Sequence, residues 1–338
     1  MNINSYIKRV SNFTYKELAF NEVDFLIFSE LAYIDLQLVV PQLGNNKKKF
    51  IKLKDISEER IDEINHRSVD DKYNKVMLKS MMKSKRYQDI LVGYAYEIFS
   101  KELANQFAAF TLILPNKVAF ITFRGTDISL AGWKEDLIGT YLSETLAQKE
   151  ARSYTNHVLG EIDNKFYLGG HSKGGNLAMF SALNLIKKDY EDRLISALSF
   201  DGPGFKDDVS ETPVFQRMES KLEKYLTNRD VIGVMFNQIK NPKIVKSTGL
   251  LFGGHDPFFW QVSKNNVGQF LHIKKRTNSS IIGQKTFELW IPRIPDSDKM
   301  LAVEALFDIF KDDTIYQLFS NAPKSIINYK KSLKLLKR

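Results

Sequence analysis

The stretch over residues 165–180 constrains the fold more than any other part of the chain. The apolar run Phe166–Leu168 predicts a buried strand, and apolar residues at helical spacing over 177–186 predict a helix directly after it. Gly170–Gly174 lies between them and reads G-x-S-x-G. In a strand–turn–helix context this motif predicts a nucleophile elbow, a sharp and strained turn that exposes the hydroxyl of Ser172.

The alternative for this glycine-rich turn is a phosphate-binding loop. Neither G-x-G-x-x-G nor G-x-x-x-x-G-K-[ST] occurs in the chain. The elbow also places Ser172 at a helix N-terminus, where developing negative charge is favoured. The sequence therefore favours a serine nucleophile over a bound phosphate.

The pattern along the chain predicts an α/β protein. An antiparallel meander enters a largely parallel sheet, and strand–helix alternation places helices on both faces. Strands are predicted over 90–99, 106–114, 117–123, 165–169, 194–200 and 222–227, and helices over 17–36, 147–160 and 175–188. Asn21 is a candidate N-cap of the first helix. Further on, 287–291 reads as a strand or edge segment, and 297–311 and 314–336 read as helices.

The chain has 338 residues, of which 43% are hydrophobic, so it can build a substantial core. We expect one domain over 1–338 with a core at about 90–275. An N-terminal helical segment over 1–88 and a C-terminal helical segment over 295–338 would pack on that core.

Several classes are disfavoured by the sequence. It contains no cysteine, no H-E-x-x-H and no carboxylate-rich calcium loop, so we expect neither a metal nor a cofactor. It has no signal-peptide pattern and no run of about 18 apolar residues, so we expect a cytoplasmic protein that does not span a membrane. The pattern does not address the oligomeric state.

The formal net charge is +9, and residues 324–338 carry six basic residues and no acidic one. This tail predicts a terminal helix packed on the domain with a solvated basic face, and the weaker alternative is peripheral contact with an anionic membrane. No zinc-finger or RNP motif occurs, so nucleic acid is not an expected partner.

A serine nucleophile needs a histidine base, and a carboxylate to hold that base. When the serine stands on an elbow, the acid and then the histidine follow it along the chain. Of the five histidines only His255 and His272 follow Ser172. His255 lies in the loop signal Gly253–Pro257, whereas His272 lies in an alternating apolar stretch. We therefore predict His255 as the base.

The acid should lie just beyond a strand that follows the elbow. Asp230 fits this position after 222–227, and Asp201 fits it after 194–200. Asp201 also opens a tight turn, where aspartate has a structural role, so Asp230 ranks first and Asp201 second. Asp256 ranks third, because it is adjacent to His255 and cannot easily orient the same ring.

An oxyanion hole needs two backbone N–H groups. The amide of Lys173 follows the nucleophile, and the loop Arg124–Asp127 after an early strand can supply the amide of Thr126. We expect Arg124 and Asp127 to pair and rigidify this loop, and the side chain of Lys173 to face solvent. Trp133 and Phe258–Trp260 are expected in the core, with Phe258–Trp260 as an alternative wall of an acyl pocket.

These motifs together resemble the class 3 (fungal-type) lipases. The shared pattern is F-R-G-T at Phe123–Thr126, W-x-x-D at Trp133–Asp136 and G-H-S-x-G-G-x-x-A at Gly170–Ala178. A bacterial lipase-like family is more similar still, through F-R-G-T-D, G-W-K-E-D, S-F-D-G-P-G-F at Ser199–Phe205 and H-D-P-x-x-W at His255–Trp260. The resemblance covers roughly residues 14–310.

The resemblance implies an α/β-hydrolase fold and a Ser172–Asp230–His255 triad with Thr126 as an oxyanion donor. We therefore expect a serine hydrolase that cleaves carboxylic esters, with a small-molecule ester or a lipid as substrate, through an acyl-serine intermediate. The same triad also suits a thioesterase, an acyltransferase or a peptidase, and the fold alone suits a non-catalytic binding module.

Overall fold

The computed structural model describes residues 1–45, 48–64, 71–100, 105–126, 144–237, 241–249, 251–290, 293–295 and 298. The helices in this part are α1 (Ile3–Val10), α2 (Glu22–Glu30), α3 (Glu58–Glu63), α4 (Asp71–Met82), α6 (Leu146–Glu161), α7 (Lys173–Leu183), α8 (Lys188–Arg193), α9 (Pro213–Met218) and α10 (Asn278–Trp290). The strands are β1 (Phe50–Lys52), β2 (Leu91–Ser100), β3 (Asn105–Ile113), β4 (Ala119–Phe123), β5 (Phe166–His171), β6 (Leu194–Phe200), β7 (Leu222–Thr227) and β8 (Lys243–Val245).

These strands form a mixed sheet in the order of the sequence, from β1 to β8. The pairs from β1 to β4 are antiparallel, and the pairs from β4 to β8 are parallel. The predicted α/β class, with an antiparallel meander leading into a parallel half, is confirmed. With the elbow between β5 and α7, this is an α/β-hydrolase fold.

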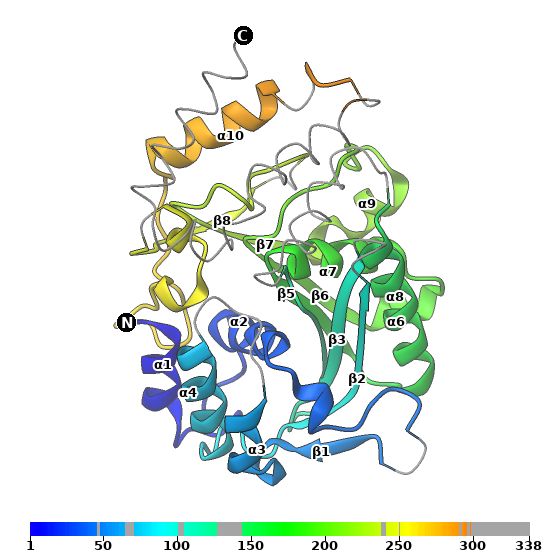
Figure 1. Ribbon diagram of the computed structural model, residues 1–338, viewed down its shortest axis with the longest axis vertical. Helices are drawn as coiled ribbons and strands as arrows, with labels where there is room; N and C mark the ends of the chain where they lie inside the picture. Colours follow the sequence, from blue (N-terminus) through cyan, green and yellow to red (C-terminus); the bar gives the residue numbers. More distant parts are fainter. Residues whose placement is uncertain are drawn as a thin grey trace.

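The sequential order of the parallel strands decides which helices cover which face. Crossovers between parallel strands are right-handed, so steps in one direction along the sheet place every connecting helix on the same face. That face is covered by α6 and α7, and the N-terminal helix α2 covers the opposite face (Figure 1). Helices therefore lie on both faces, as predicted, but the second layer comes from the chain before the sheet.

Each face has its own apolar core, and the strands feed both by alternation. In β4, Phe120 packs with the N-terminal helices, whereas Ile121 and Phe123 pack with α6 and α7. Both cores are fully closed around this strand, because all of its residues are buried. The carboxyl ends of β4 to β7 are thereby fixed from both sides, and they carry the site described below.

The first predicted helix, over 17–36, is too long. The helix α2 begins at Glu22, because Asn21 forms a capping box with Asp24, and a 3₁₀ turn replaces it from Leu31 onward. The N-cap prediction for Asn21 is confirmed.

The strand prediction for 287–291 is wrong. Residues 287–290 belong to α10, which starts nine residues earlier, where the hydroxyl of Thr277 accepts a hydrogen bond from Ser280 N at 3.4 Å. A short apolar run suits a strand or a helix equally, and the cap upstream decides for the helix. The predicted helices over 297–311 and 314–336 and the basic tail 324–338 lie outside the described residues, apart from 298.

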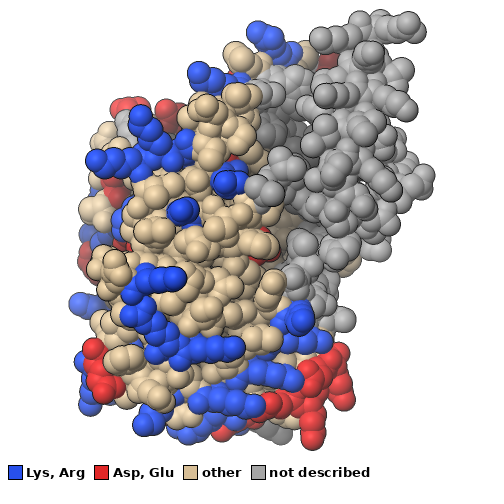
Figure 2. Space-filling view, turned by 90° about the vertical axis from the view of Figure 1, so that its left-hand side faces the viewer, with Lys and Arg blue, Asp and Glu red and all other residues tan. Residues whose placement is uncertain are grey.

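The face drawn in Figure 2 shows where charge gathers on the described surface. Basic side chains lie over the lower half of this face. Two lysines in this region pair with acidic residues, Lys79 of α4 with Asp62 at 2.8 Å, and Lys83, directly after α4, with Glu58 at 2.9 Å. None of the helices in the described part of the chain combines the length and the apolar character needed to cross a bilayer.

Candidate active site

The turn between β5 and α7 holds Ser172 in a strained conformation. Its φ is 58° and its ψ is −132°, a backbone geometry that L-residues rarely adopt. The surrounding structure enforces it, because Ser172 N donates to Phe200 O at 2.9 Å and Gly175 N donates to Ser172 O at 2.9 Å. The strand, the strained serine and the helix are the geometry of a nucleophile elbow.

Two glycines of the motif allow strand and helix to approach each other. A Cβ atom on Gly170 would lie 2.3 Å from the carbonyl carbon of Gly174, and a Cβ atom on Gly174 would lie 2.2 Å from the carbonyl oxygen of Phe123. No side chain fits at either position without moving backbone. The spacing of the motif is therefore a packing requirement of this turn.

Asp230 follows the end of β7 and His255 lies in the loop after β8, and the fold brings the two side chains together. The Nδ1 of His255 lies 2.9 Å from Asp230 Oδ1. The same carboxylate accepts Ile232 N at 3.1 Å on Oδ1 and Gly233 N on Oδ2. A carboxylate accepts hydrogen bonds only, so we assign the Nδ1 proton to His255, which leaves a lone pair on Nε2.

The Nε2 of His255 is buried and has no hydrogen-bond partner among the described residues. Ser172 is brought to the same place through its neighbour His171, whose Nε2 lies 3.0 Å from the carbonyl oxygen of His255. The two imidazole rings are 4.6 Å apart between centroids. No direct hydrogen bond joins Ser172 to His255 in the described structure, and in unliganded sites this bond is often long.

The two neighbouring histidines have opposite electrostatic surroundings. Burial, and then the positive charge of His255, lower the pKa of His171 well below its ordinary value, so His171 is neutral. Burial also lowers the pKa of His255, but Asp230 and Asp201 outweigh it and raise the pKa to about 10. Only His255 therefore has the carboxylate support that a base needs when it takes up a proton.

A network from α2 supports the elbow from below. The Nδ1 of His171 lies 3.3 Å from Tyr33 Oη and 3.3 Å from Glu30 Oε1, and the hydroxyl of Tyr33 also donates to the carbonyl oxygen of His171 at 3.2 Å. Burial, followed by the charge of Asp256, raises the pKa of the Glu30 carboxyl well above its ordinary value. This network holds the residue that precedes the nucleophile.

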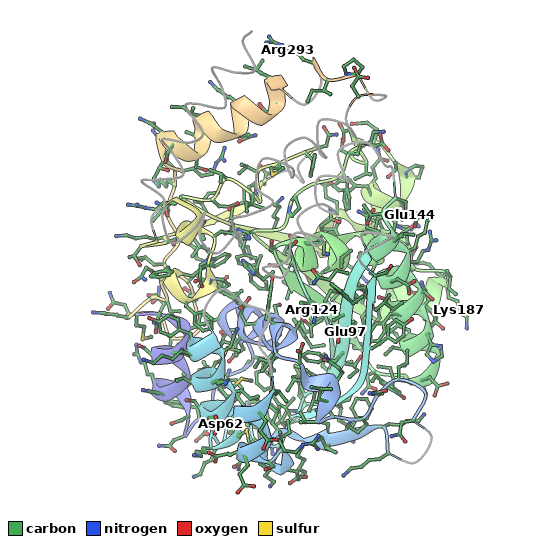
Figure 3. All side chains as sticks on the ribbon, in the orientation of Figure 1. Asp62, Glu97, Arg124, Glu144, Lys187 and Arg293 are labelled. Atoms are coloured by element: carbon green, nitrogen blue, oxygen red, sulfur yellow. The ribbon has the colours of Figure 1, made fainter. Side chains whose placement is uncertain are left out.

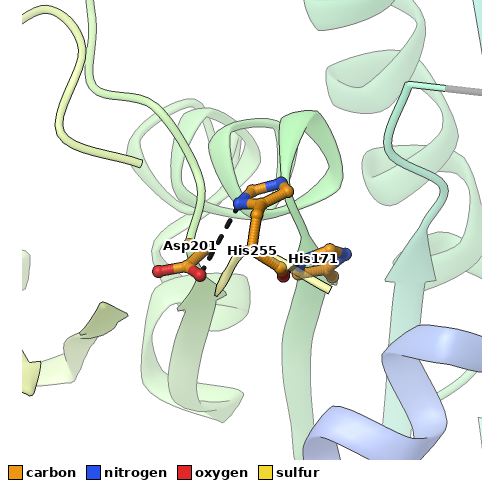
Figure 4. A group of neighbouring side chains, drawn as sticks. All are labelled: His171, Asp201 and His255. Atoms are coloured by element: carbon orange, nitrogen blue, oxygen red, sulfur yellow. Dashed lines mark hydrogen bonds and ion pairs between the residues drawn. The ribbon is translucent and has the colours of Figure 1, made fainter. Parts of the chain in front are cut away.

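Asp201 lies on the same ring nitrogen as Asp230. Its Oδ2 is 3.6 Å from His255 Nδ1, and its Oδ1 accepts Thr227 N at 2.7 Å. Figure 4 shows this carboxylate pointing at the imidazole from the end of β6. Burial, and then the charge of Asp230, raise the pKa of Asp201 to about 7. The structure therefore gives the histidine two carboxylate neighbours, and Asp230 makes the shorter contact.

His171, Asp201 and His255 offer ring nitrogens and a carboxylate oxygen within 4.8 Å of one another. Such a set can in principle hold a metal ion. Here, however, Nδ1 of His255 is bonded to Asp230, and Nε2 of His171 lies against the carbonyl oxygen of His255. These two ring nitrogens are already oriented toward protein partners, which disfavours a metal centre built from this trio.

The loop after β4 reaches the nucleophile. A Cβ atom on Gly125 would lie 2.1 Å from Tyr33 Oη, 2.6 Å from the carbonyl oxygen of His171 and 3.1 Å from Ser172 Cβ. Thr126 is the next residue and is half-buried. The predicted oxyanion donors Thr126 and Lys173 therefore belong to segments that meet at Ser172.

Arg124 anchors this loop in an unexpected way. Its guanidinium pairs with Glu97 at 2.7 Å and lies 3.6 Å from Asp35, and all three side chains come from different segments (Figure 3 labels Arg124 and Glu97). Asp127, the predicted partner, and Trp133 lie outside the described residues. The loop is held by β2 and by the segment after α2.

The prediction that the side chain of Lys173 faces solvent is wrong. Lys173 is only 6% exposed, and its Nζ donates to the carbonyl oxygen of Gln106 at 2.9 Å. The side chain crosses from the first turn of α7 to the start of β3, where the backbone carbonyl of Gln106 accepts it. Lys173 thus ties the helix that carries the elbow to the antiparallel half of the sheet.

The remaining candidates have structural positions. Asp256 caps a short 3₁₀ helix by accepting Phe258 N at 2.9 Å, and His272 pairs with Glu22 at 2.7 Å. Trp260 and Phe258 are buried in the core, whereas Phe259 is exposed. These positions agree with the predicted core role of Trp260 and with the lower rank of Asp256 and His272.

The sequence reasoning missed Tyr33 and Glu30. Both lie in a largely apolar run, Phe25–Ile34, whose burial makes a carboxyl group costly unless it is hydrogen-bonded. Glu30 within that run was the available signal. Their partner His171 could not be identified, because the contact depends on how α2 packs against β5.

Comparison with models of protein families gives a match over much of the chain. A family model described as Mbeg1-like matches residues 81–308, which is more than half of the chain. No curated protein sequence is similar enough to match.

Solved structures also match this chain at low sequence identity, among them the following three. The structure of M37 lipase matches with 18% identity and a TM-score of 0.43, over 65% of this chain and 71% of that one. The Rhizomucor miehei lipase propeptide complex matches with 16% identity and a TM-score of 0.37, over 58% and 66%. A mutant form of MDLA from Penicillium cyclopium matches with 12% identity and a TM-score of 0.40, over 78% and 90%.

Proposed function

The chain belongs to the Mbeg1-like family, and from this premise we propose that it is a serine hydrolase that cleaves carboxylic esters through Ser172, His255 and Asp230. One observation carries the proposal. Beside a strained serine at an elbow lies a histidine whose Nδ1 is held by Asp230 and whose buried Nε2 has no partner among the described residues. Structural histidines use both nitrogens where they can, and a base must leave one available.

In the proposed reaction, Ser172 Oγ attacks the ester carbonyl and its proton passes to His255 Nε2. The tetrahedral intermediate then collapses, the C–O bond to the alcohol breaks, and His255 returns the proton to the leaving alcohol. Water attacks the acyl-serine in the same way, with His255 again taking and returning a proton. Asp230 keeps Nδ1 protonated and stabilises the imidazolium in both steps.

The proposed oxyanion donors are the amides of Thr126 and Lys173. Their segments are held by packing that does not need the substrate, since Gly125 lies against Ser172 and Lys173 is tied to Gln106. Donors fixed in advance stabilise the tetrahedral oxygen without reorganising during the reaction. This arrangement supports acyl transfer over a simple binding role.

The test is a kinetic screen with p-nitrophenyl esters of increasing acyl length and with acyl-CoA thioesters, on wild type and Ser172→Ala. We expect ester hydrolysis by wild type and a loss of about 10³-fold or more in kcat/KM in the variant. Ser181→Ala is the matched control, because Ser181 is a buried serine of the same helix and its hydroxyl lacks a partner in the described structure.

Two outcomes would contradict the proposal. The first is wild-type protein that hydrolyses none of the esters, and the second is a Ser172→Ala variant as active as Ser181→Ala. Faster turnover of thioesters than of esters would retain the triad and reassign the substrate to the thioester class.

A further inference from the structure

Asp201 is a second buried carboxylate whose role the proposed triad does not explain. Its side chain is fully buried, and Oδ2 has no hydrogen-bond partner within the described part of the chain. That oxygen lies 3.6 Å from His255 Nδ1, the nitrogen that Asp230 holds at 2.9 Å. Two carboxylates thus approach one imidazole nitrogen from the ends of neighbouring strands, β6 and β7.

The backbone at Asp201 is strained, although a turn alone does not require aspartate there. Its φ is 49°, in the left-handed region where glycine is free of the steric cost. Asp201 N donates to Tyr225 O at 2.8 Å, a bond that any residue except proline can make. Strain of this kind persists where the side chain has a function. The carboxylate, and not the turn, accounts for aspartate at this position.

Thr227 connects Asp201 to the histidine loop. Its backbone N–H donates to Asp201 Oδ1 at 2.7 Å, and its hydroxyl donates to the carbonyl oxygen of Gly254 at 2.9 Å. Gly233 closes the other side, since a Cβ atom there would lie 2.6 Å from Asp230 Oδ2 and 2.8 Å from Asp201 C. Both carboxylates and His255 are therefore fixed relative to one another by short backbone connections.

Titratable groups from the neighbouring segments face Asp201, Asp230 and His255. Lys224 on β7 and Arg276 before α10 face the carboxylates. Burial is the main cause that lowers the pKa of both groups, and it brings the pKa of Lys224 to about 7. On the other side of His255 lie His171 of β5, Glu30 of α2 and Asp256. Burial lowers the pKa of His171 and raises the pKa of the Glu30 carboxyl, which favours the neutral form of both groups. Asp201 and Asp230 are the carboxyl groups in contact with the ring.

We propose that Asp201 is a second positioning residue for His255. Together with Asp230, Asp201 stabilises the His255 imidazolium, and it sets the pH above which the neutral base becomes available. This inference rests on the proposed function. When the serine proton reaches Nε2, the new positive charge faces two carboxylates, which stabilise it. The same charges hold the resting histidine protonated to a higher pH. The raised pKa of Asp201, about 7, places its own ionisation within the working range.

The sign of the effect follows from the charges. Removing the carboxylate of Asp201 destabilises the imidazolium, so the pKa of His255 falls and the neutral base persists to lower pH. We therefore expect Asp201→Asn to move the acid limb of kcat/KM to lower pH by about one unit or more, the usual effect of a charge at this distance. A merely structural role would change stability or amount of active enzyme and leave the position of the limb unchanged.

The experiment measures two rates against pH, ester hydrolysis and inactivation by a fluorophosphonate, from about pH 5 to about pH 10. The variants are Asp201→Asn, which keeps an acceptor for Thr227 N, and Asp201→Gly, which relieves the positive φ and so guards against failure to fold. Asp207→Asn is the matched control, because Asp207 is an exposed carboxylate of the following loop. It should leave the limb where it is in wild type.

A second arm removes Asp230. If Asp201 also supports the imidazole ring, kcat/KM of Asp230→Asn should fall by less than the about 10⁴-fold that follows the loss of a sole triad acid. In the double variant, kcat/KM should fall by the remainder. The inference is overturned if wild type reacts with the fluorophosphonate while both Asp201 variants keep the wild-type limb. Wild-type protein that does not react at all overturns the proposed function instead.

Discussion

This molecule contains two buried clusters of charged residues, and they are built differently. In the first, Arg86 pairs with Asp24 at 2.5 Å and donates to the carbonyl oxygens of Leu18 and Ala19, while Tyr87 donates to Asp24 at 2.6 Å. Each polar atom of the guanidinium and the carboxylate has a partner. This cluster closes the N-terminal helices onto the chain before β2.

In the second cluster, Asp230 is fully bonded, but Nε2 of His255 and Oδ2 of Asp201 have no hydrogen-bond partner in the described structure. Buried polar groups are costly when they are unsatisfied, so the second cluster carries a cost in stability that the first does not. The two clusters are alike in burial and charge, and they differ in whether their polar atoms all have hydrogen-bond partners. The closed cluster stabilises, and the open cluster is available for chemistry.

The largest effect should come from the open cluster. His255→Ala removes the proposed base, so we expect kcat/KM to fall by about 10⁴-fold or more, measured with the best p-nitrophenyl ester. His272→Ala is the matched control, because His272 pairs with Glu22 on the surface. If both variants lose activity equally, His255 is not the base.

The closed cluster should respond in stability instead. Asp24→Asn leaves Arg86 as an uncompensated buried charge, which costs about 3–5 kcal/mol of unfolding free energy, measured by guanidinium titration. Asp189→Asn breaks an exposed pair with Arg193 and should cost less than about 1 kcal/mol. Activity per folded molecule should stay at the wild-type level in both. An equal, small loss in the two variants would remove the distinction between the clusters.

Gly125→Ala tests how the oxyanion loop is fitted to the elbow. The new methyl group would meet Tyr33 Oη, the carbonyl oxygen of His171 and Ser172 Cβ, so the loop must move away from the serine. Loss of one oxyanion donor typically costs about 10²–10³-fold in kcat, and we expect kcat to fall by about that factor while KM changes little. Gly160→Ala, at a helix position with room for a methyl group, is the control.

The pH dependence of stability tests the electrostatics of His255 in the absence of substrate. The pKa of His255 is raised from about 6.5 to about 10 on folding, so its protonation stabilises the fold fully below about pH 6.5. This contribution is lost as pH rises toward about 10, by at most about 1.4 kcal/mol per pH unit. His255→Gln should remove this slope from chemical unfolding curves. A variant with the wild-type slope would show that another group titrates.

Much of the fold could be predicted from the sequence because its strands are short, apolar and bounded by turns. Residues 194–200 and 222–227 were predicted as strands, and β6 and β7 have these bounds. Helix limits were less accurate, since α2 begins at its capping box and not at its first apolar residue. The second helical layer could not be placed, because it depends on the handedness of crossovers between neighbouring strands.

Within the site, the motif indicated Ser172, and chain order indicated His255 and Asp230. Sequence reasoning ranked Asp201 and Asp230 as alternatives, whereas the structure places both on one imidazole. That arrangement depends on the register of β6 against β7, which no local pattern encodes. The burial of Lys173 was missed for a similar reason, since its acceptor lies on a distant strand.

The role of Ser172 as the nucleophile is tested most directly by treating the intact protein with a fluorophosphonate. The modified residue is then located by mass spectrometry of its peptides. We expect a single adduct on Ser172, which is absent from Ser172→Ala and forms at the wild-type rate in Ser181→Ala. Reaction at another serine, or no reaction in wild type under conditions where the protein is folded, would contradict it.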